Sequence, residues 1–590
     1  MTADNGSVLT VSAEAGVQGT WPERAVAPGE AAVFFAGWLV DRDRLAEELG
    51  VDQDTPLSDA ELVLAAYRRW SASAFVRLRG GFAVVVWDER SRAARAVRDQ
   101  LGVHPLFRAE VGNSHLFATS IDALVRDPRV PRQPDRSALL GMLAPSMPIH
   151  DETPYAAIRR IPQGHLLELG EAGSRVYRYW DPAPPGEAVR WVLDDEIERF
   201  DDLVAQAVRR CLAHGGPAIY LSGGLDSVSV AAYAADLSNS PPLALSLAFP
   251  RGDANEEVVQ RSVAQTLGLP QVMLPLGEAA GPAGVLQEAL DLAVSWPVPL
   301  QGPWLPAYLR LNEEAVARGC RTILTGGGGD EWLTVNPYWG ADLMRRLRFA
   351  ELVRFSLVYR RSFRLGTRHI FRNLWLYGLR ELLLEGGQAL VPRLVAAARL
   401  KHRLDELPAW IASDPAAREL LRYRLSVPAP SSSIRSAYLR EMRSALDHAL
   451  MDLVMEEHYE GASRYDLRFV QPYWDADLVE FLYRLRPEVL HQGGRAKGLV
   501  RESLDRRFPD CGFGQQKKVA ATNVFMAVID SEAATARRRL GPIHALTSLG
   551  VLDPARIENA LDGMLAGKTR LSAHRIWDIL GLEAWARAHL

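Results

Sequence analysis

The sequence predicts two fused units, an α+β unit followed by an α/β unit built on a parallel sheet. Residues 31–130 contain apolar, strand-like runs around one strongly helical segment, which favours an α+β unit. A proline-rich stretch at 181–185 (DPAPP) is typical of a linker. From 194 to 324 strands alternate with helices, and this alternation predicts a parallel sheet.

In the first unit, three strands and one helix can be placed on the sequence. The strands are apolar runs over 31–40, 81–87 and 115–119. Residues 59–70 have apolar side chains at helical spacing. Ser58 is the expected N-cap of this helix, and Glu61 completes a capping box.

The second unit is expected to alternate helices with strands. The helices are predicted over 194–214, 228–236, 256–267 and 306–318. The strands are predicted over 218–221, 243–249, 271–274 and 321–324. Residues 341–460 are mostly helical in pattern.

Composition and charge exclude several classes of protein. The 590 residues are 48% hydrophobic, which excludes a disordered chain, and a net charge of −4 argues against binding nucleic acid through bulk charge. Neither a signal peptide nor a membrane span is expected, and no membrane partner. The cysteines are far apart, which argues against a disulfide scaffold or a zinc module and for a reducing, cytoplasmic compartment: Cys211, Cys320 and Cys511.

The first candidate site is the loop Tyr220–Ser227 (YLSGGLDS), between an expected strand and helix. Paired glycines let the backbone approach a ligand, and the amides at a helix start attract anions. The carboxylate of Asp226 would repel phosphate unless a cation lies between them, so the loop predicts a magnesium-bound polyphosphate. It is not a Walker A loop, and an ordinary glycine-rich turn is the alternative.

A second loop, Thr325–Glu331 (TGGGGDE), also follows an expected strand. In a parallel sheet both loops lie at the carboxyl ends of strands, where ligands bind. Asp226 and Asp330 are therefore expected to share one metal ion. The alternative is a tight turn with solvated acids.

A third feature is the run 464–501, which contains 468–475 (RFVQPYWD), 478–481 (LVEF) and Lys497 in the glycine-rich segment 493–501 (GGRAKGLVR). A desolvated lysine in a cleft can stabilise a developing negative charge. On spacing alone, the commoner arrangement is a solvent-facing lysine beside a helix start.

These three segments, in this order, resemble the synthetase domain of asparagine synthetases and β-lactam synthetases. Segments of the first unit resemble the glutaminase-type domain of that family: 58–61 (SDAE), 78–83 (LRGGFA), 87–88 (WD) and 98–106 (RDQLGVHPL). The resemblance implies an α+β glutaminase-like (Ntn-type) sandwich domain fused to an α/β PP-loop ATP pyrophosphatase (adenine nucleotide α-hydrolase-like) synthetase domain with helical elaboration. The implied boundaries are 1–185 and 190–590, with a helical insertion at about 341–455.

The resemblance also implies the site and its chemistry. Asp226 and Asp330 would hold Mg²⁺, and Lys497 would stabilise the acyl-adenylate reaction, in which a carboxylate attacks the α-phosphate of ATP and an amine then displaces AMP. ATP and its pyrophosphate would be bound by Leu221, Ser222, Gly223, Gly224, Asp226, Ser227, Leu247, Thr325, Gly326 and Gly327.

Two departures from the family bear on function. The family's glutaminases use a cysteine directly after the initiator methionine, but this chain has Thr2 there and no cysteine before Cys211. The HRGPD-like and GEIYNH-like segments are also missing, and the nearest equivalent of the latter is 35–39 (FAGWL). We therefore expect that this protein does not release ammonia from glutamine. The alternative is that Thr2 replaces the cysteine as the nucleophile of a glutaminase.

The second departure is Gly327, which stands where asparagine synthetases carry a glutamate implicated in handling the proton of the amine. The sequence does not rank the replacement candidates, which are Glu331, Glu441, Glu456 and Glu457.

A degenerate glutaminase domain beside an intact synthetase domain fits two branches of the family. One closes a β-lactam ring. The other, which we favour, is the lasso peptide cyclase, which joins an Asp or Glu side chain of a precursor peptide to the peptide's N-terminal amine in an isopeptide macrolactam. A leader peptidase and a leader-binding protein would then be partners.

Residues 341–380 bear on that choice, because they hold ten arginines and seven aromatic residues against two acids. Such a surface could hold a peptide. The alternative is a helical pair with core aromatics and solvated arginines. Three other functions stay open: an amide synthetase for a small molecule, a divergent asparagine synthetase, and a non-catalytic nucleotide-binding scaffold.

Overall fold

The computed structural model describes residues 7–12, 16–52, 56–144, 149–171, 173–184, 189–250, 255–427, 434–516, 522–567 and 573–590. Two positions named above lie outside these ranges: Thr2, and Pro185 at the end of the expected linker. Within the described chain, no helix combines the length and the apolar character needed to cross a membrane.

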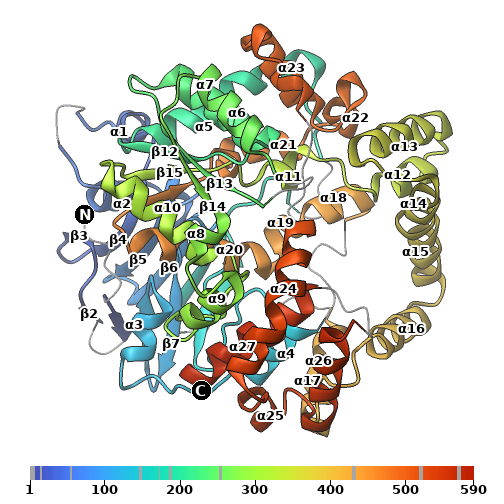
Figure 1. Ribbon diagram of the computed structural model, residues 1–590. Coiled ribbons are helices and arrows are strands. Elements are labelled where there is room, and N and C mark those ends of the chain that lie inside the picture. Colours follow the sequence, from blue (N-terminus) through green and yellow to red (C-terminus); the bar gives the residue numbers. More distant parts are fainter. Residues whose placement is uncertain are drawn as a thin grey trace.

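Two antiparallel sheets form the N-terminal part (blue in Figure 1). One has the order β2-β1-β8-β7-β9 and the other β11-β10-β6-β5-β4-β3. Their bounds are β1 (Leu9–Ser12), β2 (Gly16–Gly19), β3 (Glu23–Ala27), β4 (Ala31–Leu39), β5 (Gly80–Asp88), β6 (Ala93–Arg98), β7 (Phe107–Val111), β8 (Ser114–Ala118), β9 (Ile158–Arg160), β10 (His165–Gly170) and β11 (Gly173–Arg178). The predicted strands 31–40, 81–87 and 115–119 are confirmed as β4, β5 and β8.

The run of apolar residues in β5 is explained by packing against both faces of its sheet. Val85 packs in the core between the two sheets, whereas Val84 and Val86 pack toward α2 (Asp59–Trp70). The capping box predicted at the start of α2 is present, because the Ser58 amide donates to the Glu61 carboxylate at 2.7 Å. The two-sheet arrangement with flanking helices agrees with the α+β prediction.

The second sheet system is parallel throughout, as the alternation predicts. Its order is β14-β13-β12-β15-β16. The strands are β12 (Pro217–Tyr220), β13 (Leu243–Ala248), β14 (Gln271–Pro275), β15 (Thr322–Leu324) and β16 (Arg468–Val470). Sequence reasoning missed β16, because three residues far along the chain carry no strand periodicity of their own.

Helices cover both faces of this sheet (Figure 1). One face packs on α5 (Arg199–Leu212), α6 (Leu225–Leu237) and α21 (Ala476–Tyr483). The other packs on α8 (Leu276–Ala280), α9 (Val285–Ala293) and α10 (Leu305–Ala317). The helix predicted over 194–214 is confirmed as α5, but its predicted start is wrong. The Leu193 amide donates to the Glu196 carboxylate at 2.9 Å and closes a short 3-10 turn, Asp194–Glu196, before α5 begins.

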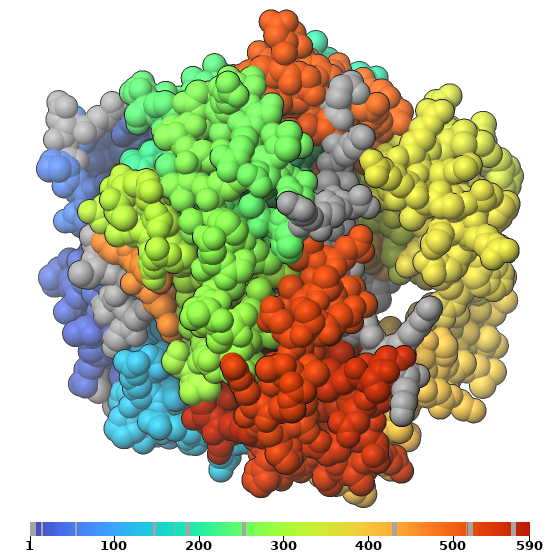
Figure 2. Space-filling model, in the orientation of Figure 1, coloured from blue at the N-terminus to red at the C-terminus, as the bar shows by residue number. Residues whose placement is uncertain are grey.

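Four helices form what we call the helical arm, which stands off the body in Figures 1 and 2. They are α13 (Phe349–Phe363), α14 (Thr367–Asn373), α15 (Arg380–Leu390) and α16 (Pro392–Asp405). A π-helical turn, Leu374–Leu379, joins α14 to α15. No residue of α14, α15 or α16 is buried. The space-filling view shows a hollow between the arm (yellow) and the red C-terminal helices, among them α24 (Thr522–Leu540).

Candidate active site

The two glycine-rich loops meet, because they follow the adjacent parallel strands β12 and β15. A Cβ atom on Gly326 would lie 2.5 Å from the backbone nitrogen of Ser227. One on Gly329 would lie 2.3 Å from Cγ of Asp226. A side chain at either position would therefore force the loops apart, which explains the glycines of the second loop.

The first loop is held by its own hydroxyls. The Ser222 and Ser227 hydroxyl oxygens are 3.0 Å apart, and the Ser227 hydroxyl donates to the Gly224 carbonyl at 3.0 Å. Gly223 has a φ of 79°, in the region that favours glycine. The loop leads into the 13-residue helix α6, whose N-terminus has no side-chain cap, so its first amides remain directed at the loop.

Three other predicted residues contribute backbone or local bonds. The side chains of Leu221 and Leu247 are buried in the cores on opposite faces of the sheet, so only their backbone groups can face a ligand. The Thr325 hydroxyl accepts a hydrogen bond from the Gly327 amide at 2.9 Å. This bond shapes the second loop.

Lys497 points into the site, so the solvent-facing alternative is wrong. Its Nζ donates to Asp330 Oδ1 at 2.7 Å and also to Asp226, and its side chain is only 8% exposed. Burial alone would lower the pKa of Lys497, but the two carboxylates outweigh burial and raise it. The lysine is therefore charged and lies between the two acids.

The segment before α23 (Gly498–Arg507) holds the lysine in place. A Cβ on Gly498 would lie 2.2 Å from the carbonyl oxygen of Gln492, so this segment folds tightly on itself. The Ala496 amide donates to the Ser362 hydroxyl of α13 at 2.8 Å. The helical arm thus contacts the residue next to Lys497.

Asp226 and Asp330 are close enough to share one cation, because both bind the same ammonium nitrogen. Among the residues with described positions, no group of three or more His, Cys, Asp or Glu is arranged to hold a metal. Two carboxylates fit Mg²⁺ when substrate phosphates supply further oxygens, since Mg²⁺ is usually bound in that way.

Sequence reasoning singled out the segment 468–475 but assigned no role to Gln471, which directly follows β16 and is buried. A Cβ on Gly327 would lie 2.5 Å from its Oε1. Gln471 thus fills the space that a larger residue at 327 would need. The sequence signal for Gln471 was QPYW after a short apolar run. That run can be recognised as the end of a strand only once β16 is known.

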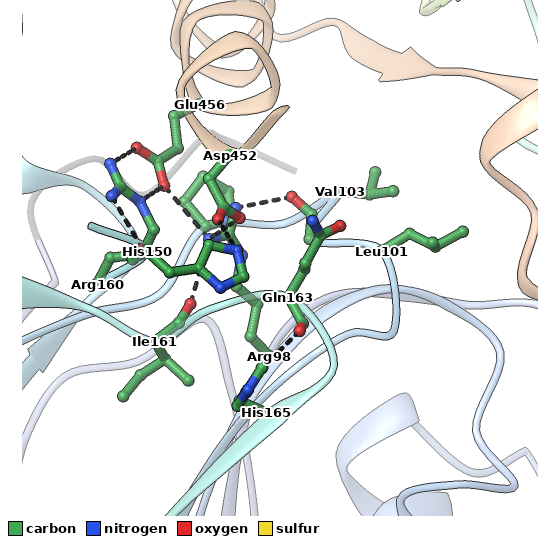
Figure 3. Close-up of polar contacts among 12 residues, drawn as sticks. Arg98, Leu101, Val103, His150, Arg160, Ile161, Gln163, His165, Asp452 and Glu456 are labelled. Atoms are coloured by element: carbon green, nitrogen blue, oxygen red, sulfur yellow. Dashed lines mark hydrogen bonds and ion pairs between the residues drawn. The ribbon is translucent and has the colours of Figure 1, made fainter. Parts of the chain in front are cut away.

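One of the four candidate glutamates belongs to a buried junction between the two parts of the chain (Figure 3). Glu456 lies on α20 (Ala449–Ser463), and its Oε2 accepts from Arg160 Nη2 at 2.7 Å. One helical turn away, Asp452 is 3.0 Å from Arg98 Nη1 and 2.7 Å from His150 Nε2. The carboxylate of Glu456 is therefore held by an N-terminal arginine.

The other three glutamates lie elsewhere. Burial, with Asp330 nearby, raises the pKa of Glu331. Burial also raises the pKa of Glu441 on α18 (Ala437–Met442). Glu457 lines a cavity beside Tyr220, the residue before the first loop. The structure thus removes Glu456 from the candidates and leaves three.

The aromatic residues of 341–380 divide between core and surface. Phe355 is buried and stacks on His491, with ring centroids 5.5 Å apart. Phe371 and Trp375 are 68% and 52% exposed. The interpretation of these aromatics as core residues therefore holds for Phe355 and is wrong for the other two.

Comparison with known proteins gives two family matches. The asparagine synthase model matches residues 199–587, and the glutamine amidotransferase domain model matches 19–180.

Curated relatives match over shorter stretches. The chain is 33% identical over 212 residues to the glutamine-hydrolyzing asparagine synthetase 3 of Bacillus subtilis, covering 34% of this chain and 33% of that protein. It is 30% identical over 324 residues to the amidase chyE of Penicillium rubens, covering 51% and 46%. The chain thus spans less than half the length of these relatives. Among solved structures, glutamine phosphoribosylpyrophosphate amidotransferase from B. subtilis is 14% identical, covering 42% of this chain and 47% of its own, with a TM-score of 0.19.

Proposed function

We propose, since this chain belongs to the asparagine synthase family, that it is an ATP-dependent, amide-forming ligase. The observation that carries the proposal is the position of the Lys497 ammonium between Asp226 and Asp330, where two glycine-rich loops meet. A buried cation among acids at a loop edge is suited to a reaction in which negative charge moves between phosphate oxygens.

In this proposal the loop 221–227 is a PP-loop that cradles the pyrophosphate of ATP. Asp226 and Asp330 would hold Mg²⁺, which would neutralise the phosphate charge. A substrate carboxylate attacks the α-phosphate and pyrophosphate leaves; an amine then attacks the acyl carbon and AMP leaves. Lys497 stabilises the charge that develops on the oxygens in these steps.

The nitrogen is proposed to come from an amine on the substrate rather than from glutamine. A glutaminase of the family needs a cysteine after the initiator methionine, and this sequence has Thr2 there. The amide donor and acceptor can then belong to one molecule, which makes the product a ring.

We propose further that the substrate is a precursor peptide and that the enzyme is a lasso peptide cyclase. The helical arm supports this choice. Residues 349–405 carry eleven basic against four acidic side chains, and Phe371 and Trp375 are largely exposed there. Aromatic and arginine side chains are the residues that interfaces favour, and the arm contacts the segment of Lys497. A leader peptidase and a leader-binding protein are the partners this function would require.

The test is pyrophosphate release from ATP and Mg²⁺ with a short precursor peptide encoded beside the gene. We expect release with the native peptide, a product lighter than the peptide by one water, and neither with a peptide whose Asp and Glu are replaced by Asn and Gln. An acetylated N-terminus should permit pyrophosphate release but block the product.

Other outcomes would point to the other functions. Turnover that required free aspartate and ammonia would make the chain a divergent asparagine synthetase. Turnover only of a small amino acid would favour a β-lactam synthetase-like or other small-molecule enzyme. No release with any carboxylate would contradict the ligase proposal and favour a scaffold.

A further inference from the structure

A cavity of about 230 Å³ lies beside the glycine-rich loops, and the chemistry proposed above does not use it. It lies between the parallel sheet, α10 and α20. Four aromatic residues line it: Tyr220, Trp304, Tyr308 and Phe469. The centroid of the Tyr220 ring is 5.0 Å from that of Tyr308 and 6.0 Å from that of Phe469.

The cavity is at the edge of the sheet where the loops lie. Tyr220 is the last residue of β12 and directly precedes Leu221 of the first loop. The lining segment 301–304 precedes α10, which leads back to the start of β15. It is therefore at the carboxyl end of the strands, where open parallel sheets bind ligands.

One acid lies among these rings. Glu457 of α20 accepts a hydrogen bond from the Gln301 amide at 2.7 Å. No basic side chain within the described ranges forms an ion pair with it. Its neighbour His458 also lines the cavity and stacks on Phe469, with centroids 4.3 Å apart. Burial lowers the pKa of His458 to about 4, so this imidazole is neutral and supplies no counter-charge.

A carboxyl group without a basic partner in an aromatic cavity is suited to a cation. The π-electron faces of aromatic rings attract ammonium groups, and a buried carboxylate is stabilised by a bound cation. An anionic ligand would be repelled by both. We infer that this cavity binds a primary ammonium group on a small aliphatic stem, with Glu457 as its counter-ion.

In the peptide ligase this ammonium would be the acceptor amine, held next to the first loop. It would give one proton to the Glu457 carboxylate, and the neutral amine would then attack the acyl carbon as the bond from that carbon to AMP breaks. That assignment rests on the proposed function. Binding of an ammonium ion does not, because it needs neither ATP nor peptide.

The test uses n-butylammonium as the probe and n-butanol as its neutral isostere, titrated into the full chain by calorimetry. We expect saturable binding of n-butylammonium and at least about tenfold weaker binding by Glu457→Gln. Glu460→Gln is the matched control, because Glu460 lies on the same helix and pairs with Arg464 at 3.2 Å, away from the cavity. A second variant, Tyr308→Leu, changes a partly exposed ring of the cavity and should weaken n-butylammonium binding less than Glu457→Gln does. It tests the same cavity if Glu457→Gln does not fold.

A pH series gives a second readout. Burial raises the pKa of Glu457 to about 7, so its carboxylate ionises between pH 6 and 8. Affinity for n-butylammonium should therefore rise about tenfold over that range, and stay flat in Glu457→Gln. The groups that face Glu457 do not change charge there, since burial holds the pKa of His458 near 4 and raises those of Tyr220 and Tyr308.

Equal binding by wild type and Glu457→Gln, n-butanol binding as tight as that of the ammonium ion, or no saturable binding would each overturn the inference. The two proposals fail separately. Pyrophosphate release without ammonium binding would refute only the cavity assignment, and ammonium binding without pyrophosphate release would refute only the ligase.

Discussion

The N-terminal paired sheets and the C-terminal parallel sheet use their charged side chains in opposite ways. In the N-terminal part, Arg98 and Arg160 are fully buried against the acids of α20. At the parallel sheet, Asp226, Asp330 and Lys497 gather at a loop edge, and the side chain of Asp330 is 52% exposed. The first set joins two parts of the molecule, whereas the second can meet a ligand.

The difference teaches that the packing of a sheet and the chemistry at its edge are separable. The core of the N-terminal sheets depends on apolar side chains spread over many strands. The proposed loss of glutaminase chemistry rests instead on Thr2 and on the missing HRGPD-like and GEIYNH-like segments. A sheet fold can therefore persist when residues outside its core change.

The largest expected effect on turnover is at Asp226, and its absence would contradict this comparison. Asp226→Ala removes a carboxylate at the meeting point of the two loops, and we expect pyrophosphate release to fall by about 1,000-fold or more. The matched control is Glu313→Gln on α10, a partly exposed acid outside the loops. Turnover within twofold of wild type would contradict the role of Asp226.

Lys497→Met should lower kcat by about 100- to 1,000-fold, because it removes the only described cation between the two acids while keeping the length of the side chain. Nucleotide binding, measured by equilibrium dialysis, should remain. Loss of ATP binding together with turnover would mean that Lys497 serves the fold of the loops instead.

At the junction, Glu456→Gln should lower the free energy of unfolding by about 3–5 kcal/mol, because it leaves buried arginine charge uncompensated. Urea unfolding measures this. Glu48→Gln, in an exposed pair with Arg77, should cost less than about 1 kcal/mol. Normal stability with lost turnover would return Glu456 to the list of catalytic candidates.

On the helical arm, Trp375→Ala should raise the KM for the peptide by about tenfold, since exposed aromatic anchors contribute about 1–2 kcal/mol to such contacts. The KM for ATP and the thermal midpoint should not change. Val258→Ala on α7 (Glu257–Thr266), an exposed apolar residue on another face, is the control. An unchanged peptide KM would remove the arm from the substrate site.

The smallest expected effect is at the N-terminus. Thr2→Ala should change neither pyrophosphate release nor product formation. Neither the wild type nor Thr2→Ala should release ammonia from glutamine. Ammonia release by wild type that is lost in Thr2→Ala would make Thr2 a working nucleophile, and the comparison between the two parts would fail.

The sequence alone determined the features that depend on local order. The glycine-rich loops, the helix 59–70 with its capping box and the parallel alternation follow from residue types at fixed spacing, and the structure confirms them. The proposal of a shared cation site at Asp226 and Asp330 also came from strand order, because loops after neighbouring parallel strands meet.

Only the tertiary structure decided the rest, because those features depend on contacts between residues far apart in the chain. Spacing favoured a solvent-facing Lys497, yet two acids from other loops bind it. Gln471 and β16 have meaning only beside β15. Burial in the arm, and the pairing of α20 with N-terminal arginines, likewise depend on which surfaces pack together, and that information is spread over the whole chain rather than held in any one segment.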